Sequence, residues 1–190
     1  MKDNLTELVF ILDRSGSMSG LEKDTIGGFT SMLTKQKALD GQCRITTVLF
    51  NNHYTLLHDR IDIQAVSPMT EKEYFVGGST ALLDAIGRTI QKLVHVQKNT
   101  AENYRAAKVM FIIITDGEEN SSREYSSDKI KTMIEHEKEK YGWEFCLPGR
   151  EHRRRADCQT LWNRCGPCRR LCSGLCRDHA ELYRNVRGRR

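Results

Sequence analysis

Asp13, Ser15 and Ser17 are the residues whose types and spacing point most directly to chemistry. They follow a run of five apolar residues, 8–12, and lie in a turn rich in serine and glycine. At alternate positions of a tight turn, one carboxylate and two hydroxyls offer oxygen ligands with little formal charge. Such ligands suit Mg²⁺, which prefers octahedral coordination and keeps several waters. The pattern indicates a divalent-cation site, and the alternative is an ordinary turn with a capping serine.

Two more oxygen ligands occupy similar places much further along the chain. Asp116 follows a second apolar run, residues 109–115, and Thr80 precedes a helical pattern. In a parallel sheet the carboxyl ends of the strands share one edge, and the helices that cross back begin at that edge. We therefore expect two carboxylates and three hydroxyls to converge there, which is a more specific signal than any of these motifs alone. The alternative for Thr80 is that it only caps the helix.

The elements that must position these side chains follow from hydrophobic periodicity. Apolar runs bounded by turns predict strands, and apolar residues at helical spacing predict amphipathic helices. By these criteria the strands cover residues 8–12, 43–50, 54–63, 109–115 and 141–145, and the helices cover 21–37, 81–98 and 127–140. The tight turn after residue 50 predicts an edge hairpin. The sequence thus predicts an α/β fold over residues 1–145, with a mostly parallel, Rossmann-like sheet between helices on both faces.

Three short motifs, with their spacing and flanking strands, resemble those of a von Willebrand factor type A domain from about residue 5 to residue 145. They are Asp-Arg-Ser-Gly-Ser at 13–17, Gly-Ser-Thr-Ala-Leu around Thr80, and Ile-Thr-Asp-Gly around Asp116. Within that family the chain looks most like the small, stand-alone bacterial and phage members.

The resemblance implies a metal-ion-dependent adhesion site made by Asp13, Ser15, Ser17, Thr80 and Asp116. The three hydroxyls would contact Mg²⁺, with Mn²⁺ or Ca²⁺ as alternative ions, and the two carboxylates would hold its waters. An ion held in this way keeps much of its charge and one exchangeable position. The implied partner is therefore a protein that presents an aspartate or a glutamate.

An enzyme is the alternative from another class, because aspartate beside Mg²⁺ also begins some phosphoryl transfers. Such a hydrolase needs a nucleophile or a base. Asp13 is followed by Arg14 rather than by a second carboxylate, and no Gly-x4-Gly-Lys-Ser/Thr phosphate loop occurs. The six histidines show no paired metal-binding spacing. We therefore expect a protein-binding module and not an enzyme.

Composition divides the chain at about residue 145. The first part is net acidic, whereas residues 146–190 hold twelve arginines and six of the seven cysteines, with no lysine, isoleucine or methionine. The overall charge of +5 therefore does not indicate a nucleic-acid partner for the first part. No apolar run is long enough for a membrane span, and the first residues lack a signal-peptide pattern. We expect a cytoplasmic protein with no membrane partner.

We interpret residues 146–190 as the product of a shifted reading frame, because a GC-rich gene read out of frame yields such a composition. Codons for residues 147–155 can be chosen so that reading one base later encodes an apolar continuation of the preceding strand. The expected consequence is a domain truncated at its C-terminal part and followed by a disordered tail. One alternative is a zinc site at Cys165 and Cys168 together with Cys158, Cys172 and Cys176. The others are a thioredoxin-like pair at Cys165 and Cys168, or nucleic-acid binding by the arginines.

Overall fold

The two central strands form where the sequence offers unbroken apolar runs. The computed structural model describes residues 2–146, in which β1 (Lys2–Asp13) and β4 (Ala106–Ile114) pair in parallel. Residues 8–12 and 109–113 are all buried, which explains why neither run alternates with polar residues. Both predicted central strands are confirmed.

The remaining strands extend the sheet on either side, in the order β3-β2-β1-β4-β5. They are β2 (Gln42–Phe50), β3 (Tyr54–Asp62) and the short β5 (Glu144–Cys146). Every pairing is parallel except the antiparallel β2–β3 hairpin, as predicted. The carboxyl ends of β1, β2 and β4 therefore meet at one edge of the sheet, which we call the carboxyl edge.

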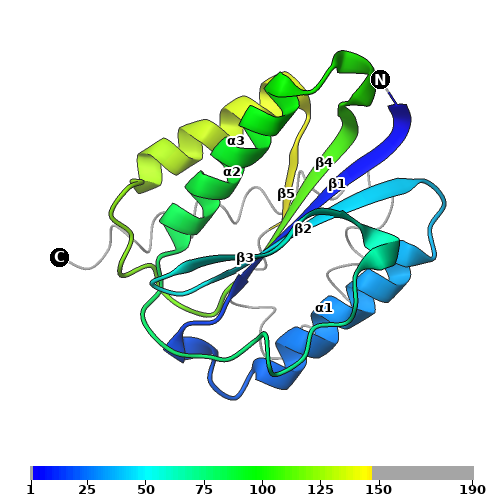
Figure 1. Ribbon diagram of the computed structural model, residues 1–190. Helices are drawn as coiled ribbons and strands as arrows, with labels where there is room; N and C mark the ends of the chain where they lie inside the picture. The colour runs from blue at the N-terminus through cyan, green and yellow to red at the C-terminus, as the bar shows by residue number, and fades with distance from the viewer. Residues whose placement is uncertain (1, 147–190) are drawn as a thin grey trace.

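Helices cover both faces of this sheet (Figure 1). α1 (Glu22–Lys37) packs on one face, where Phe29 and Leu33 join Phe10 and Leu12 in a buried cluster. α2 (Leu82–Asn99) and α3 (Ser127–Tyr141) lie beside each other on the opposite face. That face has its own cluster, which includes Ile11 and residues of both helices. The predicted three-layer α/β fold is confirmed.

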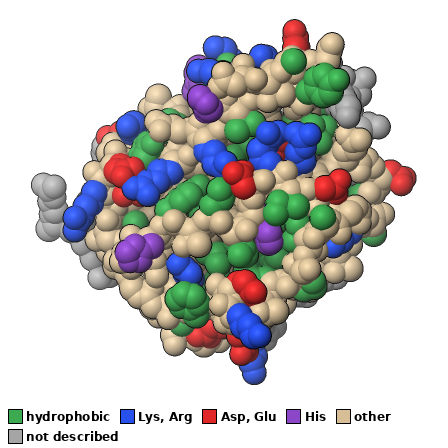
Figure 2. All heavy atoms as spheres, viewed as in Figure 1, with side chains coloured by type: hydrophobic (Ala, Val, Ile, Leu, Met, Phe, Trp, Pro, Cys, Tyr) green, Lys and Arg blue, Asp and Glu red, His purple; other side chains and the backbone are tan. Residues whose placement is uncertain are grey.

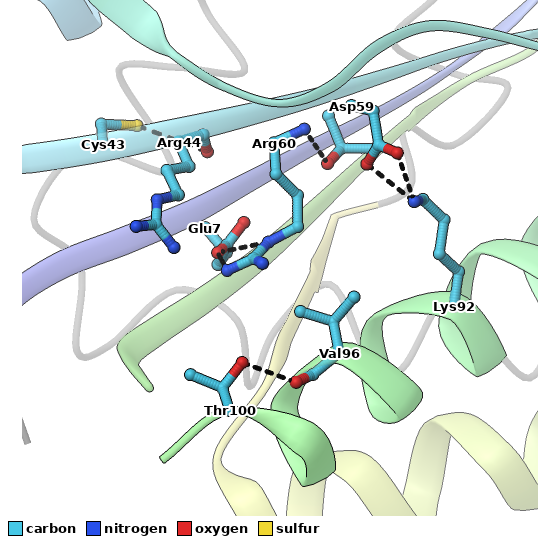
Figure 3. A network of polar contacts seen from close by, with 9 residues as sticks. Glu7, Cys43, Arg44, Asp59, Arg60, Lys92, Val96 and Thr100 are labelled. Atoms are coloured by element: carbon cyan, nitrogen blue, oxygen red, sulfur yellow. Dashed lines mark hydrogen bonds and ion pairs between the residues drawn. The ribbon is translucent and has the colours of Figure 1, made fainter. Parts of the chain in front are cut away.

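A buried ion pair crosses the sheet beneath α2 (Figure 3). Glu7 of β1 is fully buried, and Arg60 of β3 reaches over β2 to donate from Nε to its carboxylate at 2.9 Å. Arg60 lies at an irregularity in the β2–β3 pairing and has a φ of 51°, a left-handed conformation that is uncommon outside glycine. This local conformation places the guanidinium on Glu7. Nearby, Lys92 of α2 pairs with the exposed Asp59 at 2.7 Å.

α3 buries one charged residue. Ile130 and Ile134 face the core, and Glu137 is also buried, although glutamate is a residue type that usually lies exposed. Its position, three residues after Ile134, continues the apolar stripe of the helix. Gly142, with a φ of 65°, ends α3 in a left-handed cap and turns the chain into β5.

The predicted boundary between a domain and a tail, after residue 145, falls one residue before the end of β5, which includes Cys146. Residues 147–190 lie outside the described residues, so the interpretations of the tail stay predictions. On the face of the described residues that Figure 2 shows, basic and acidic side chains are interspersed. This distribution differs from the continuous basic stripe that indicates nucleic-acid binding.

Candidate metal centre

The loop after β1 builds the first part of the site. Asp13 ends the strand and is fully buried, and its Oδ1 accepts a hydrogen bond from the backbone N–H of Ser15 at 2.7 Å. A short helical turn, Gly16–Met18, then brings the hydroxyls of Ser15 and Ser17 to 2.9 Å from each other. The carboxylate and the two hydroxyls of the Asp-x-Ser-x-Ser motif therefore lie together, as predicted.

The loop after β4 closes on the same point. Thr115 donates its hydroxyl to Oδ2 of Asp13 at 2.6 Å, which ties the two strand ends together. A Cβ atom added to Gly117 would lie 2.6 Å from Oγ1 of Thr80, 2.8 Å from Oγ of Ser17 and 3.0 Å from Oδ2 of Asp13. Three oxygens from two separate segments, the loop after β1 and the segment before α2, thus surround one point beside Gly117. We call the space around this point the oxygen cradle.

Asp116 is half-buried and belongs to the loop after β4. It stands between Thr115, which donates to Asp13, and Gly117, which faces the three oxygens. The backbone therefore brings all five predicted site residues to the carboxyl edge. Gly117 does not have a positive φ, so the small residue serves to leave space rather than to permit an unusual conformation.

Thr80 contributes its side chain to the oxygen cradle and not to a helix cap. The N-cap of α2 is Ala81, which makes no side-chain cap bond, so the capping alternative for Thr80 is wrong. Instead, Asn120 holds the backbone of Thr80 with two hydrogen bonds. The side-chain Oδ1 of Asn120 accepts the N–H of Thr80 at 2.9 Å, and the backbone N–H of Asn120 donates to the carbonyl of Thr80 at 3.1 Å. The sequence analysis missed Asn120, because a contact across forty positions leaves no local signal.

Carboxylates bind the rest of the loop after β4 to the first turn of α2. Glu119 accepts the N–H of Leu83 at 2.9 Å. In the opposite direction, Asp84 of α2 accepts the N–H groups of Arg123, Glu124 and Tyr125 at 2.9–3.0 Å. A Cβ on Gly87 would also meet the Tyr125 ring at 2.4 Å, so helix and loop pack closely. These contacts fix the loop that carries Asp116.

A third segment, residues 74–78, ties down the loop after β1. The Tyr74 hydroxyl donates to the carbonyl of Asp13, and the N–H of Gly77 donates to the carbonyl of Arg14 at 2.8 Å. Burial raises the pKa of Tyr74 to about 12, so its hydroxyl keeps its proton at physiological pH. Burial also lowers the pKa of Arg14, partly offset by its Coulombic interaction with Tyr74. Nothing in the local sequence revealed the role of Tyr74.

The oxygen cradle fits a small, hard cation. Hydroxyl and carboxylate oxygens are the ligand type that Mg²⁺ prefers, and a site with few charged ligands leaves room for its waters. Within residues 2–146 no three His, Cys, Asp or Glu side chains gather as a metal-binding group. A metal site here would therefore depend on the serine and threonine hydroxyls.

Two solved structures of other proteins share the fold of this chain. A von Willebrand factor type A domain from Catenulispora acidiphila is similar in fold, with a TM-score of 0.51, 14% identity and coverage of 75% of this chain and 32% of that one. A mutant of the PilB minor pilin from Streptococcus sanguinis gives a TM-score of 0.50 with 14% identity over 86% of this chain and 55% of that one. The ArnB paralog VWA2 from Sulfolobus acidocaldarius has 22% identity over 64% of this chain and 30% of that one, with a TM-score of 0.45.

At these identities the structures with TM-scores of 0.51 and 0.50 show the fold alone. The chain spans only 30% to 55% of the lengths of the three proteins. No curated protein matches the chain. Between residues 2 and 146, none of the helices combines the length and the apolar composition that crossing a membrane requires.

The sequence profile of the von Willebrand factor type A domain matches residues 7–143, which include all five predicted site residues, the second half of β1 and all of β4. Domains of this kind generally mediate protein–protein interaction. The chain belongs to the von Willebrand factor type A domain family.

Proposed function

We propose that this domain is a divalent-metal-dependent protein-binding module that engages an acidic residue of its partner. Asp13, Ser15, Ser17, Thr80 and Asp116 would hold the ion, Mg²⁺ or alternatively Mn²⁺ or Ca²⁺. One observation supports this proposal above the others. The oxygens of Asp13, Ser17 and Thr80 all lie within 3.0 Å of the point where a Gly117 side chain would begin.

Each residue would have a distinct task in this site. The hydroxyls of Ser15, Ser17 and Thr80 are uncharged ligands, and Asp13 supplies a buried negative charge whose position Ser15 and Thr115 fix. When bound, the ion would supply a positive charge and an exchangeable position that a partner's carboxylate can fill. Because hydroxyls carry no formal charge, they leave most of the ion's charge available to that carboxylate.

Asp13 is better suited to anchoring than to nucleophilic attack. Its carboxylate is fully buried, and both of its oxygens accept hydrogen bonds, from the Ser15 N–H and the Thr115 hydroxyl. A phosphoryl-transfer nucleophile needs a carboxylate oxygen that can reach the phosphorus. We therefore propose a binding role and not an enzyme, and a screen for phosphatase activity on generic substrates tests this choice. The cytoplasmic location stays a prediction, which cell fractionation tests.

Titration calorimetry with Mg²⁺ tests the metal site. The intact protein should give a binding isotherm that is lost or weakened at least tenfold in Asp13→Asn and in Ser17→Ala. Ser17 is exposed, so its truncation should leave the fold intact even if the buried Asp13 variant unfolds. Asp40→Ala is the matched control, because Asp40 is an exposed carboxylate that follows α1, far from the carboxyl edge.

Equal heats for the wild type and the Ser17 variant, both folded by circular dichroism, would contradict the metal site. The partner side of the proposal needs a second measurement. Blocked peptides containing aspartate should bind in Mg²⁺ and not in EDTA, whereas the same peptides with asparagine should bind in neither.

A further inference from the structure

Phe75 is an exposed aromatic residue at the carboxyl edge. Its side chain is 58% exposed, although its neighbour Tyr74 is 1% exposed. Four other large apolar residues among the described residues are also exposed, but each lies near the opposite edge of the sheet. Leu39 follows the end of α1, Ile61 lies near the end of β3, Tyr104 precedes β4 and Tyr141 ends α3.

The backbone that carries Phe75 is anchored to the oxygen cradle on both sides. On one side the Tyr74 hydroxyl donates to the carbonyl of Asp13. On the other side the Gly77 N–H donates to the Arg14 carbonyl at 2.8 Å, and the Asn51 amide donates to the Gly77 carbonyl at 2.7 Å. The exposed ring therefore has a fixed place, so a partner that covers it has little ordering entropy to overcome.

A buried positive charge lies against this ring. The Arg14 guanidinium carbon is 4.7 Å from the centre of the Phe75 ring, and Arg14 is only 7% exposed. One of its terminal nitrogens donates to the Thr55 hydroxyl at 2.9 Å. The Arg14 backbone adjoins the oxygen cradle between Asp13 and Ser15, and the ring lies against the guanidinium at the far end of the Arg14 side chain, so the ring stands within about three to four residue lengths of the oxygen cradle.

We propose that Phe75 and Arg14 form a second contact point for the partner, which is a protein segment with an aspartate or glutamate within four positions of a large apolar side chain. This inference rests on the proposed metal-dependent function and specifies its ligand. The acid would enter the oxygen cradle, and the apolar side chain would cover Phe75. Arg14 adds positive charge beside the ion. A segment with acidic flanking residues is therefore favoured over one with basic flanking residues. Aromatic and arginine side chains are typical of binding hot spots, and of these two residues Phe75 is the exposed one.

Fluorescence polarisation with the intact chain tests this proposal. The probes are blocked, labelled peptide pools with one aspartate, in which leucine or serine occupies the four positions on either side. In Mg²⁺ the leucine pool should bind about fivefold or more tightly than the serine pool, as expected for a hot-spot contact. Phe75→Ala should abolish this preference. Tyr104→Ala, which removes a 60% exposed aromatic near the opposite edge, should retain it.

The outcomes separate the two proposals. If the wild type binds both aspartate pools equally in Mg²⁺, or if Phe75→Ala keeps the preference for leucine, the role of Phe75 is refuted and the metal-dependent function stands. If the wild type binds no aspartate pool in a Mg²⁺-dependent way, the proposed function fails and this inference fails with it. A Mg²⁺ titration of Phe75→Ala distinguishes loss of the apolar contact from damage to the oxygen cradle.

Discussion

Gly117→Ala changes the oxygen cradle by a single methyl group. The new Cβ would lie 2.6 Å from the Thr80 hydroxyl and 2.8 Å from the Ser17 hydroxyl, whereas ordinary contacts begin at 3.4 Å. Each hydroxyl must therefore move by more than half an ångström. Mg²⁺ demands near-ideal octahedral geometry with bonds of about 2.0–2.1 Å, so ligands displaced this far no longer bind it well.

We expect at least a tenfold loss of Mg²⁺ affinity, equivalent to about 1.4 kcal/mol. Without metal, the variant should lose about 1 kcal/mol of unfolding free energy from overpacking, at the low end because Ser17 is exposed and can move. Mg²⁺ at about a hundred times the wild-type dissociation constant should stabilise the wild type by about 2.7 kcal/mol. A variant that binds Mg²⁺ tenfold more weakly should gain only about half of that stabilisation at the same Mg²⁺ concentration.

Calorimetry and thermal melts with and without Mg²⁺ measure both quantities. Gly77→Ala is the matched control, since Gly77 lies at the same edge and a Cβ there would meet nothing within 4 Å. The control should bind Mg²⁺ as the wild type does. If Gly117→Ala does so too, the cradle does not hold the ion and the reasoning is refuted.

Three further predictions concern the surroundings of the site and the stability of the fold. Asn120→Ala should weaken Mg²⁺ binding several-fold in calorimetry, because it removes the acceptor for the Thr80 N–H. Arg60→Ala should lower the unfolding free energy in urea by about 3 kcal/mol, because it leaves the carboxylate of Glu7 buried and unpaired. Glu137→Gln should raise the melting temperature at neutral pH, because burial raises the pKa of Glu137 and its ionised form therefore costs stability. That gain should vanish below pH 4.5, the ordinary pKa, where the carboxyl is protonated in both folded and unfolded states.

Each of these predictions has a result that would contradict it. Wild-type Mg²⁺ affinity in Asn120→Ala would mean that other contacts position Thr80. Lys92→Ala breaks an exposed ion pair and should lower the unfolding free energy by less than about 1 kcal/mol. An equal loss in Lys92→Ala and Arg60→Ala would mean that the buried pair contributes no more than the exposed one. A gain from Glu137→Gln that persists in acid would point to packing and not to charge.

The fold was predictable because its two central strands are apolar without interruption and both end in polar turns. Boundaries of the helices agree within one residue or so, since periodicity and turn residues act locally. The tertiary contacts that hold the site were not predictable. Thr115, Asn120 and Tyr74 contact residues forty to more than one hundred positions away, and no local pattern encodes such pairs.

Two residues show where local reasoning was misleading. Thr80 precedes a helix and looks like a cap, yet the hydroxyl faces Gly117 because Asn120 holds its backbone. Glu137 looks solvated by residue type, yet its position on the stripe of Ile134 buries it. In both cases the position in the fold outweighed the intrinsic preference of the residue.

The hydrogen bond from Thr115 to Asp13 joins residues 102 positions apart. During synthesis, a nascent chain whose β4 has not yet left the ribosome therefore has no complete binding surface, even if its first hairpin has already formed. A synthetic peptide copied from any one loop should be inert for the same reason. Moving this surface to another scaffold would require transplanting the rim of the sheet together with its loops. In a folding experiment, the gain of ligand binding would report that β4 had docked beside β1.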